Sequence, residues 1–356
     1  MNTAPSIRHE RIPAALAICR RFNLKARSEI QATLHELARS IPENLITGNP
    51  YCLIQFFSRY PEGFEVEVGF PVRDQVEGSP FECRETPPME LLSLQHSGAR
   101  ADLRTTKIAL SGHASDRALI SDEFTREEYP DWQNLEGPVI CQFVIHNWGE
   151  RFERNLRRVL GESRASGLLR DLPPPGIDAT ATDRFEWAAG MMRRLDAATT
   201  DDERYDIVSS CAHVWPPRQV EVLRTVYREA CSRSGTDPVA DVIAFMAGDP
   251  GWSEKDIRRE GNVIIHTKHP CDPVAHAAAQ TPEAKRAAYC FCPVIRDRLR
   301  QGISDTYCYC GAGWFRQEWE TATGKPVRVR VLQSVLRGDD VCQFAVELSD
   351  PPAPAL

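Results

Sequence analysis

The chain has 356 residues, of which 42% are hydrophobic and 26% are charged, and its formal net charge is -7. These proportions are typical of a soluble globular protein, and the length favours two domains over one. The basic residues are dispersed, which argues against a large nucleic-acid-binding face, and no stretch approaches the roughly 20 apolar residues of a membrane span.

The first residues, MNTAPSIRHERIPAAL, carry charges where a signal peptide would be apolar. We therefore expect a cytoplasmic protein without membrane or nucleic-acid partners. In that compartment the twelve cysteines are expected to be reduced thiols rather than a disulfide framework.

The first 150 residues are predicted to alternate helices and strands. The expected elements are a helix at 28–42, strands at 51–58 and 64–72, a strand within 82–98, a helix at 101–111 and a strand at 137–148. The first helix has apolar residues at helical spacing behind a Ser28 cap. We interpret the order as two β-α-β-β halves, an internal duplication.

The strand at 64–72 alternates, with Phe64, Val66, Val68 and Phe70 on one face and Glu65 and Glu67 on the other. If the apolar face packs on the helices, both glutamates point to the opposite, concave side. The alternative is that they are solvated positions of a half-exposed strand.

Three consecutive prolines at 173–175 cannot continue a helix, so residues 171–181 are the predicted linker. Beyond it we expect helices at 183–196, 201–211, 217–231 and 237–247, a strand at 262–266, and a hairpin over 327–348 that turns at Arg337–Asp340. The predicted fold class is α+β. The predicted parts are a duplicated β-α-β-β domain at 5–150, a helix and Pro-rich linker at 151–181, a cysteine-rich α+β domain at 182–350 and a disordered tail at 351–356.

Residues 5–148 resemble the GyrI-like domain, the effector-binding module of many AraC- and MerR-type regulators. The motifs that carry the resemblance are FEVEVGFPV (64–72) and ECRETPPMELLSLQHSG (82–98). The resemblance implies two halves facing each other across a cleft that binds small, often cationic or aromatic molecules. Some stand-alone relatives hydrolyse reactive small electrophiles.

Candidate ligand-binding residues in this cleft are the carboxylates Glu65 and Glu67 and the aromatic residues Tyr51, Phe57 and Trp132. Glu67 is also a candidate base, since a carboxylate in an apolar cleft can acquire a raised pKa.

The resemblance further implies an acid from the second half, for which Glu123 is the nearest candidate. The sequence departs from the family pattern at Ala99 and Arg100, where Pro-Tyr is usual. No helix-turn-helix fits before the module, so we do not expect a transcription factor.

Residues 183–348 resemble the ligand-binding domains related to 4-vinyl reductase and to L-2-amino-thiazoline-4-carboxylic acid hydrolase-like proteins. The motifs are YCYCGAGW (307–314), GKPVRVRVLQS (324–334) and GDDVCQF (338–344). The resemblance implies an α+β domain whose internal pocket is lined by the segment of Cys308 and Cys310. Trp314, in the same segment, is a candidate ligand contact or a core residue.

Three interpretations of the thiols stay open. Cys308 or Cys310 at a helix start can be a nucleophile whose pKa the helix end lowers, and the glycines that follow allow a ligand to approach closely. The candidate bases for this chemistry are His266, His269 and His276. The second interpretation is a zinc or iron site; its four ligands are Cys290, Cys292, Cys308 and Cys310. The third is buried core, which we expect for Cys342.

The chain lacks a Walker A loop, a GxGxxG fingerprint, an HExxH motif and a nucleophile elbow. Their absence disfavours nucleotide hydrolysis, Rossmann-type redox chemistry and α/β-hydrolase chemistry. We therefore predict a small-molecule-binding protein with two ligand-pocket domains and a reactive thiol cluster. The alternatives are a hydrolase of a small organic or sulfur-containing substrate and a thiolate-metal protein.

Overall fold

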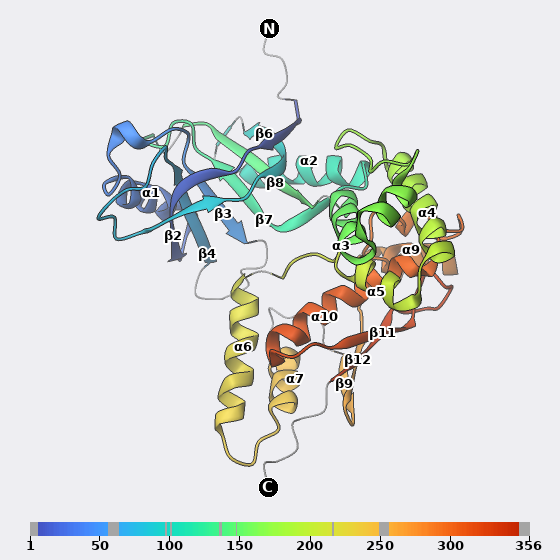
Figure 1. The fold of residues 1–356 in the computed structure, drawn as a ribbon. Coiled ribbons are helices and arrows are strands. Elements are labelled where there is room, and N and C mark those ends of the chain that lie inside the picture. Colours follow the sequence, from blue (N-terminus) through green and yellow to red (C-terminus); the bar gives the residue numbers. More distant parts are fainter. Residues whose placement is uncertain are drawn as a thin grey trace. The chain divides into compact units, whose positions relative to one another are not determined.

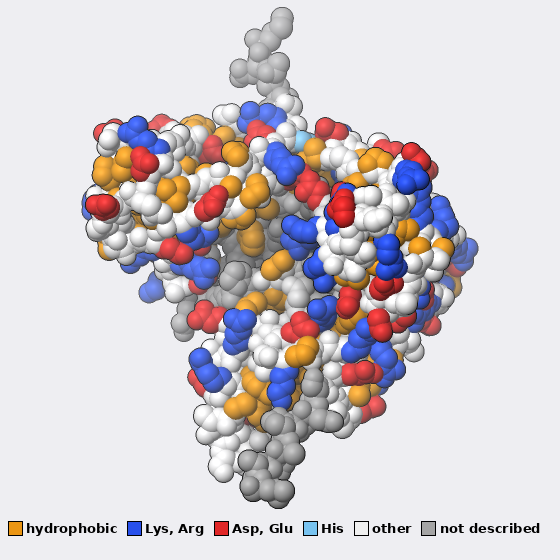
Figure 2. Space-filling view, in the orientation of Figure 1, with side chains coloured by type: hydrophobic (Ala, Val, Ile, Leu, Met, Phe, Trp, Pro, Cys, Tyr) orange, Lys and Arg blue, Asp and Glu red, His pale blue; other side chains and the backbone are white. Residues whose placement is uncertain are grey.

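The computed structural model has the predicted α+β fold and divides into two compact units, residues 1–147 and 148–356. The structure describes residues 6–55, 64–96, 98–99, 102–134, 137–146, 148–215, 217–248 and 256–348. None of the helices in these ranges is long and apolar enough to cross a membrane. On the face drawn in Figure 2, Lys and Arg side chains are interspersed with Asp and Glu side chains.

The first unit is built on one antiparallel sheet of eight strands (Figure 1). Its strands are β1 Arg8–Ile12, β2 Ala15–Leu24, β3 Tyr51–Gln55, β4 Phe64–Pro71, β5 Glu82–Thr86, β6 Met89–His96, β7 Ile120–Glu128 and β8 Val139–His146. Its helices are η1 Arg27–Glu29, α1 Ile30–Ala38, η2 Glu43–Leu45 and α2 Leu103–Asp116.

The sheet confirms the predicted duplication. Its strand order is β1-β6-β8-β7-β3-β4-β2-β5, so β3 and β7 pair at the middle. The segments β2-α1-β3-β4 and β6-α2-β7-β8 have the same element order and occupy matching places on either side of that pairing. The two halves therefore meet along the line between β3 and β7.

The alternation predicted for 64–72 is also confirmed. Val66, Val68 and Phe70 of β4 are fully buried in a core that includes Leu34 and Leu37 of α1. Residues Leu103 and Leu110 of α2 belong to the same core, so both helices cover one face of the sheet. The glutamates of β4 alternate to the opposite face, as expected.

Strands β2 and β7 were not predicted, because neither has a clean apolar face. On β2, Arg20 faces the helices with the apolar residues, and its guanidinium lies 4.7 Å from the Phe22 ring centre and pairs with Glu36. On β7, charged residues occupy both faces. Long-range ion pairs therefore replace the apolar alternation that marks an ordinary half-buried strand.

The second unit is mainly helical and carries a four-stranded antiparallel sheet of order β11-β12-β10-β9 (Figure 1). Its helices are α3 Trp148–Leu169, α4 Ala181–Ala198, α5 Asp201–Ser209, α6 Pro217–Ser232, α7 Pro238–Gly248, α8 Pro273–Ala278, α9 Pro282–Tyr289, η4 Arg296–Arg298, η5 Asp305–Cys308 and α10 Tyr309–Thr323. Its strands are β9 Asp256–Glu260, β10 Val263–Thr267, β11 Arg328–Gln333 and β12 Gln343–Glu347.

The predicted helices at 183–196, 201–211, 217–231 and 237–247 correspond to α4 to α7. The predicted strand at 262–266 is β10, and the predicted hairpin is the β11–β12 pair. The predicted linker, 171–181, lies between α3 and α4, and it contains no helix or strand before Ala181. Helix α3, assigned with the linker in the sequence, is part of the second unit.

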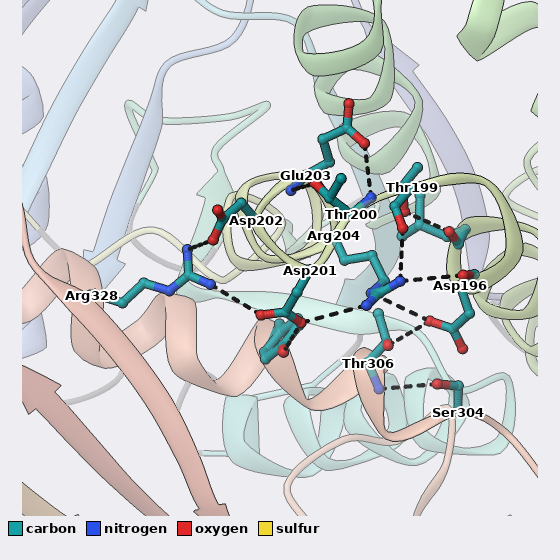
Figure 3. Close-up of polar contacts among 12 residues, drawn as sticks. Asp196, Thr199, Thr200, Asp201, Asp202, Glu203, Arg204, Ser304, Thr306 and Arg328 are labelled. Carbon is teal, nitrogen blue, oxygen red and sulfur yellow. Dashed lines mark hydrogen bonds and ion pairs between the residues drawn. The ribbon is translucent and has the colours of Figure 1, made fainter.

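A polar network fixes the start of α5 against neighbouring elements (Figure 3). Thr200 and Glu203 form a reciprocal capping box, in which Thr200 Oγ1 accepts from the Glu203 amide at 3.3 Å and the Thr200 amide donates to the carboxylate at 2.9 Å. Arg328 of β11 binds Asp201 at 3.3 Å, and Thr306 of η5 donates to Asp196 at 2.7 Å. The network thereby anchors η5, the segment that leads into the thiols.

Candidate functional site

Glu67 lies on the face of the sheet opposite the helices and is held by two arginines. It pairs with Arg21 of β2 at 3.5 Å and with Arg84 of β5, and its side chain is 12% exposed. Glu65 alternates to the same face. Because two guanidinium groups share the Glu67 carboxylate, its charge is already compensated within the protein.

Tyr51 shares this face with Glu67. A Cβ atom at Gly69 would lie 2.3 Å from Tyr51 Cζ, so the ring covers the glycine on the paired strand. The Tyr51 hydroxyl lies 3.5 Å from Cys19 Sγ, and the Arg126 guanidinium lies 4.6 Å from the ring centre. Burial raises the pKa of Tyr51, and the Cys19 thiol acts in the same direction.

The remaining predicted residues of the first unit do not join this group. Trp132 packs against Phe70 at 5.4 Å and His35 at 5.2 Å, which places it on the helix-covered side rather than with Tyr51. Phe57 lies outside the described residues. Glu123 is part of β7, but its side chain is also outside the described part of the chain.

Among the described residues of the first unit, the buried acid is Glu127, four residues beyond the predicted Glu123. It lies on β7, faces the helices, and its side chain is 0% exposed. Arg27 of η1 donates to Oε2, Lys107 Nζ of α2 lies 2.8 Å from Oε1, and Tyr129 Oη donates to Oε2 at 2.7 Å. One cation comes from each half, so Glu127 joins the two halves where β3 and β7 pair.

Charge compensation keeps Glu127 ionised. Burial opposes ionisation of the carboxylate, but the charges of Arg27 and Lys107 outweigh it and lower the pKa of Glu127. Burial and the Glu127 charge raise the pKa of Tyr129 far above its usual range, so Tyr129 stays a neutral donor. Sequence reasoning missed this site, although the alternation Thr125, Glu127, Tyr129 marks one face of a strand.

In the second unit, the structure brings the predicted thiols into one region. Cys308 Sγ lies 3.1 Å from Ser334 Oγ, Cys310 Sγ accepts from Trp148 Nε1 at 3.4 Å, and Cys292 donates to Tyr307 Oη at 3.5 Å. Cys290 is buried, and ionised charges on Cys292 and Cys308 would raise its pKa further.

The predicted lowering of the thiol pKa values is wrong. Burial raises the pKa of Cys308 and of Cys310 to about 12. The helix end does not compensate, because η5 runs directly into α10 and the Tyr309 amide is bonded to the Thr306 carbonyl. Both thiols are therefore protonated at neutral pH.

Protein atoms occupy the space beside the glycines that follow Cys310. A Cβ atom at Gly313 would lie 1.9 Å from the Ser209 carbonyl oxygen of α5, and one at Gly311 would lie 3.0 Å from the Phe344 ring. The close approach that these glycines allow is thus made by α5 and β12, not by a ligand.

The other predicted residues of this unit contact aromatic side chains of the protein. Trp314 packs on Trp215 at a ring distance of 4.4 Å within the core. His266 is buried, and its Nε2 accepts from Trp319 Nε1 at 2.8 Å, so that nitrogen is not free to act as a base. His269 contacts Phe291, and His276 contacts Tyr289.

The four cysteines proposed as metal ligands are all described. In the described part of the chain, no three His, Cys, Asp or Glu side chains are grouped as ligands of a metal ion would be. Cys342, expected in the core, is partly buried and packs against the core that contains Phe344 and Val346.

No protein-family profile matches the sequence, and no curated protein matches it. Among solved structures, the EcmrR C-terminal domain is similar at 20% identity over 40% of this chain and 98% of that one, with a TM-score of 0.34. A hydrolase from Listeria innocua has 12% identity over 40% of this chain and 93% of its own, with a TM-score of 0.29. SAV2435 bound to tetraphenylphosphonium has 10% identity over 39% of this chain and 93% of its own, with a TM-score of 0.27.

These similarities are too low to assign the chain to a family. The duplicated β-α-β-β topology of the first unit is consistent with the GyrI-like fold that its sequence resembles.

Proposed function

We propose that the first unit binds a small organic molecule on the helix-covered face of its sheet, beside Glu127. The observation that carries the proposal is a fully buried carboxylate held by one cation from each half. Buried ion pairs contribute little net stability compared with apolar residues of similar volume. A fully buried charged group on a largely apolar face is therefore a candidate for a functional role.

The surroundings of Glu127 support this assignment. Its neighbours across the pairing are Cys52 on β3 and Cys141 on β8, both buried and both on the helix-covered face. A few polar groups in an apolar setting are typical of a small-molecule site, where apolar contacts supply affinity and the polar groups orient the ligand.

The second unit supports no comparable proposal. A nucleophilic mechanism needs a thiolate, and burial keeps Cys308 and Cys310 protonated at neutral pH. Glu67, the other candidate for catalysis, is occupied by two arginines. The geometry thus favours ligand binding over hydrolysis.

The proposal can be tested by titrating the full chain with small aromatic probes of different charge and measuring binding by calorimetry. Glu127→Gln should change the affinity of a bound probe about tenfold or more, which corresponds to about 1.4 kcal/mol. Glu67→Gln is the matched control, because it makes the same change on the opposite face of the same sheet. An affinity that responds to Glu67→Gln and not to Glu127→Gln would place the site on the concave face instead.

A further inference from the structure

We infer that the ligand of this face is an organic anion, such as a carboxylate, rather than a cation. The inference rests on the proposed function and concerns the same site. Three observations carry it: the charge of the group around Glu127, the exposure of its members, and the hydrogen-bond donors of its cations.

Counted over the described side chains, the group around Glu127 carries a net positive charge. Among the described residues, Arg27 and Lys107 are the cations that interact with Glu127, and Tyr129 is neutral. Two positive charges and one negative charge leave a net charge of +1. A second cation placed here would be repelled, whereas an anion would complete the compensation.

The exposure of these side chains also favours an anionic ligand. The Glu127 side chain is 0% exposed, whereas those of Lys107 and Arg27 are 21% and 40% exposed. A ligand approaching this group therefore meets the two cations first. The carboxylate that could attract a positively charged ligand lies beneath them.

The hydrogen-bonding capacity of the cations also fits an anion. Lys107 Nζ donates to Thr125 Oγ1 at 3.3 Å in addition to its ion pair with Glu127. Of the described residues, Glu127 is the acceptor for Arg27, through one guanidinium nitrogen. A guanidinium has five N–H donors in a planar fork that suits two carboxylate oxygens. The remaining donors of Arg27 are the natural partners of an acidic group.

The test compares three probes of nearly equal shape: 2-naphthoate, neutral 2-naphthamide and 2-naphthylmethylammonium. Binding to the full chain is measured by calorimetry at pH 7 and low ionic strength. We expect naphthoate to bind at least tenfold more tightly than either of the others. Tighter binding of the ammonium compound, with an affinity that Glu127→Gln reduces, would overturn the inference and leave the proposed function standing.

Two variants then test whether Lys107 is responsible for the preference for the anionic probe. Lys107→Met should weaken naphthoate binding about tenfold and naphthamide binding much less, because it removes one charge and keeps Arg27 as the partner of Glu127. Lys25→Met is the control, since Lys25 is an exposed lysine of the same unit. Naphthoate binding that is equally sensitive to both variants would contradict the inference. If none of the three probes binds, both the inference and the proposed function fail.

Discussion

At the scale of single residues, the Glu127 carboxylate is kept ionised inside the first unit by the charges around it. Removing water from a carboxylate costs several kcal/mol, and only close opposite charges and hydrogen bonds offset that cost. Arg27, Lys107 and Tyr129 supply them here. The arrangement is therefore sensitive to the loss of any one partner.

We predict that Glu127→Gln lowers the free energy of unfolding at pH 7 by on the order of 3 kcal/mol, because two cations lose their counter-charge. The folded-state pKa of Glu127 lies below its ordinary value of 4.5. Its stabilising contribution is therefore fully present above pH 4.5 and is lost as the pH falls through the folded-state value.

Urea denaturation at pH 7, 4.5 and 3 measures this dependence. The difference between wild type and Glu127→Gln should shrink below pH 4.5. Glu67→Gln, whose arginine partners are more exposed, should have a smaller effect. A difference that is independent of pH would contradict the ionised, buried state of Glu127.

A second residue-scale prediction concerns the reactivity of Cys310. With a pKa of about 12, its thiolate fraction at neutral pH is about 1,000-fold lower than that of a thiol at the ordinary value of 9.0. We expect Cys310 to be alkylated by iodoacetamide far more slowly than the exposed Cys231. Peptide mass spectrometry after timed labelling gives both rates, and faster labelling of Cys310 would restore the nucleophile hypothesis.

At the scale of elements, α10 is fixed by a close contact with α5 through Gly313. A side chain there has no room, since its Cβ atom would meet the Ser209 carbonyl oxygen, which is backbone and cannot rotate away. The buried Phe315 and Trp319 of α10 pack in the same core as β10 and β12. The glycine is therefore a packing requirement of the second unit.

We predict that Gly313→Ala destabilises the protein by about 1–3 kcal/mol, because the overlap outweighs the better helix propensity of alanine. Gly167→Ala in α3 is the control, since nothing lies within 4 Å of the added methyl group. It should be neutral or stabilising by up to about 1 kcal/mol. Thermal unfolding of the two variants gives the comparison, and equal stabilities would show that α5 and α10 do not approach this closely.

At the scale of the whole molecule, each unit has its own core. The first core gathers α1, α2 and the eight-stranded sheet, and every residue in it comes from the first unit. The core around α10 is drawn entirely from the second unit. Neither of these two cores contains a residue of the other unit, so the apolar side chains gathered in each are buried by residues of the same unit.

We therefore predict that residues 1–147 fold cooperatively when expressed alone. Their circular dichroism spectrum and amide resonances should match those of this region in the full chain, and they should unfold in a single transition. A truncated chain without dispersed resonances would show that the first unit depends on the second for its stability.

The amino-acid sequence by itself determined the elements whose apolar periodicity is local. The alternation of β4, the helices α4 to α7, and the β11–β12 hairpin are each marked by side chains a few residues apart, so they were predictable. The duplicated order of the first unit followed from the same patterns. Strand β7 was not predictable, because its charges are balanced by residues far away in the chain.

Only the tertiary structure decided which acid is buried and how the thiols ionise. Arg27 and Glu127 are 100 residues apart, and strand register and the placement of η1 bring them together. The sequence analysis selected Glu123 and Glu67 as the acids of the ligand site, because the long-range partners of Glu127 are not evident from the sequence. The pKa values of Cys308 in η5 and Cys310 in α10 likewise follow from burial in the folded unit and not from their place at a helix start. The ionisation of a buried group depends on neighbours that long-range packing brings together, whereas apolar periodicity depends only on residues close together in the sequence.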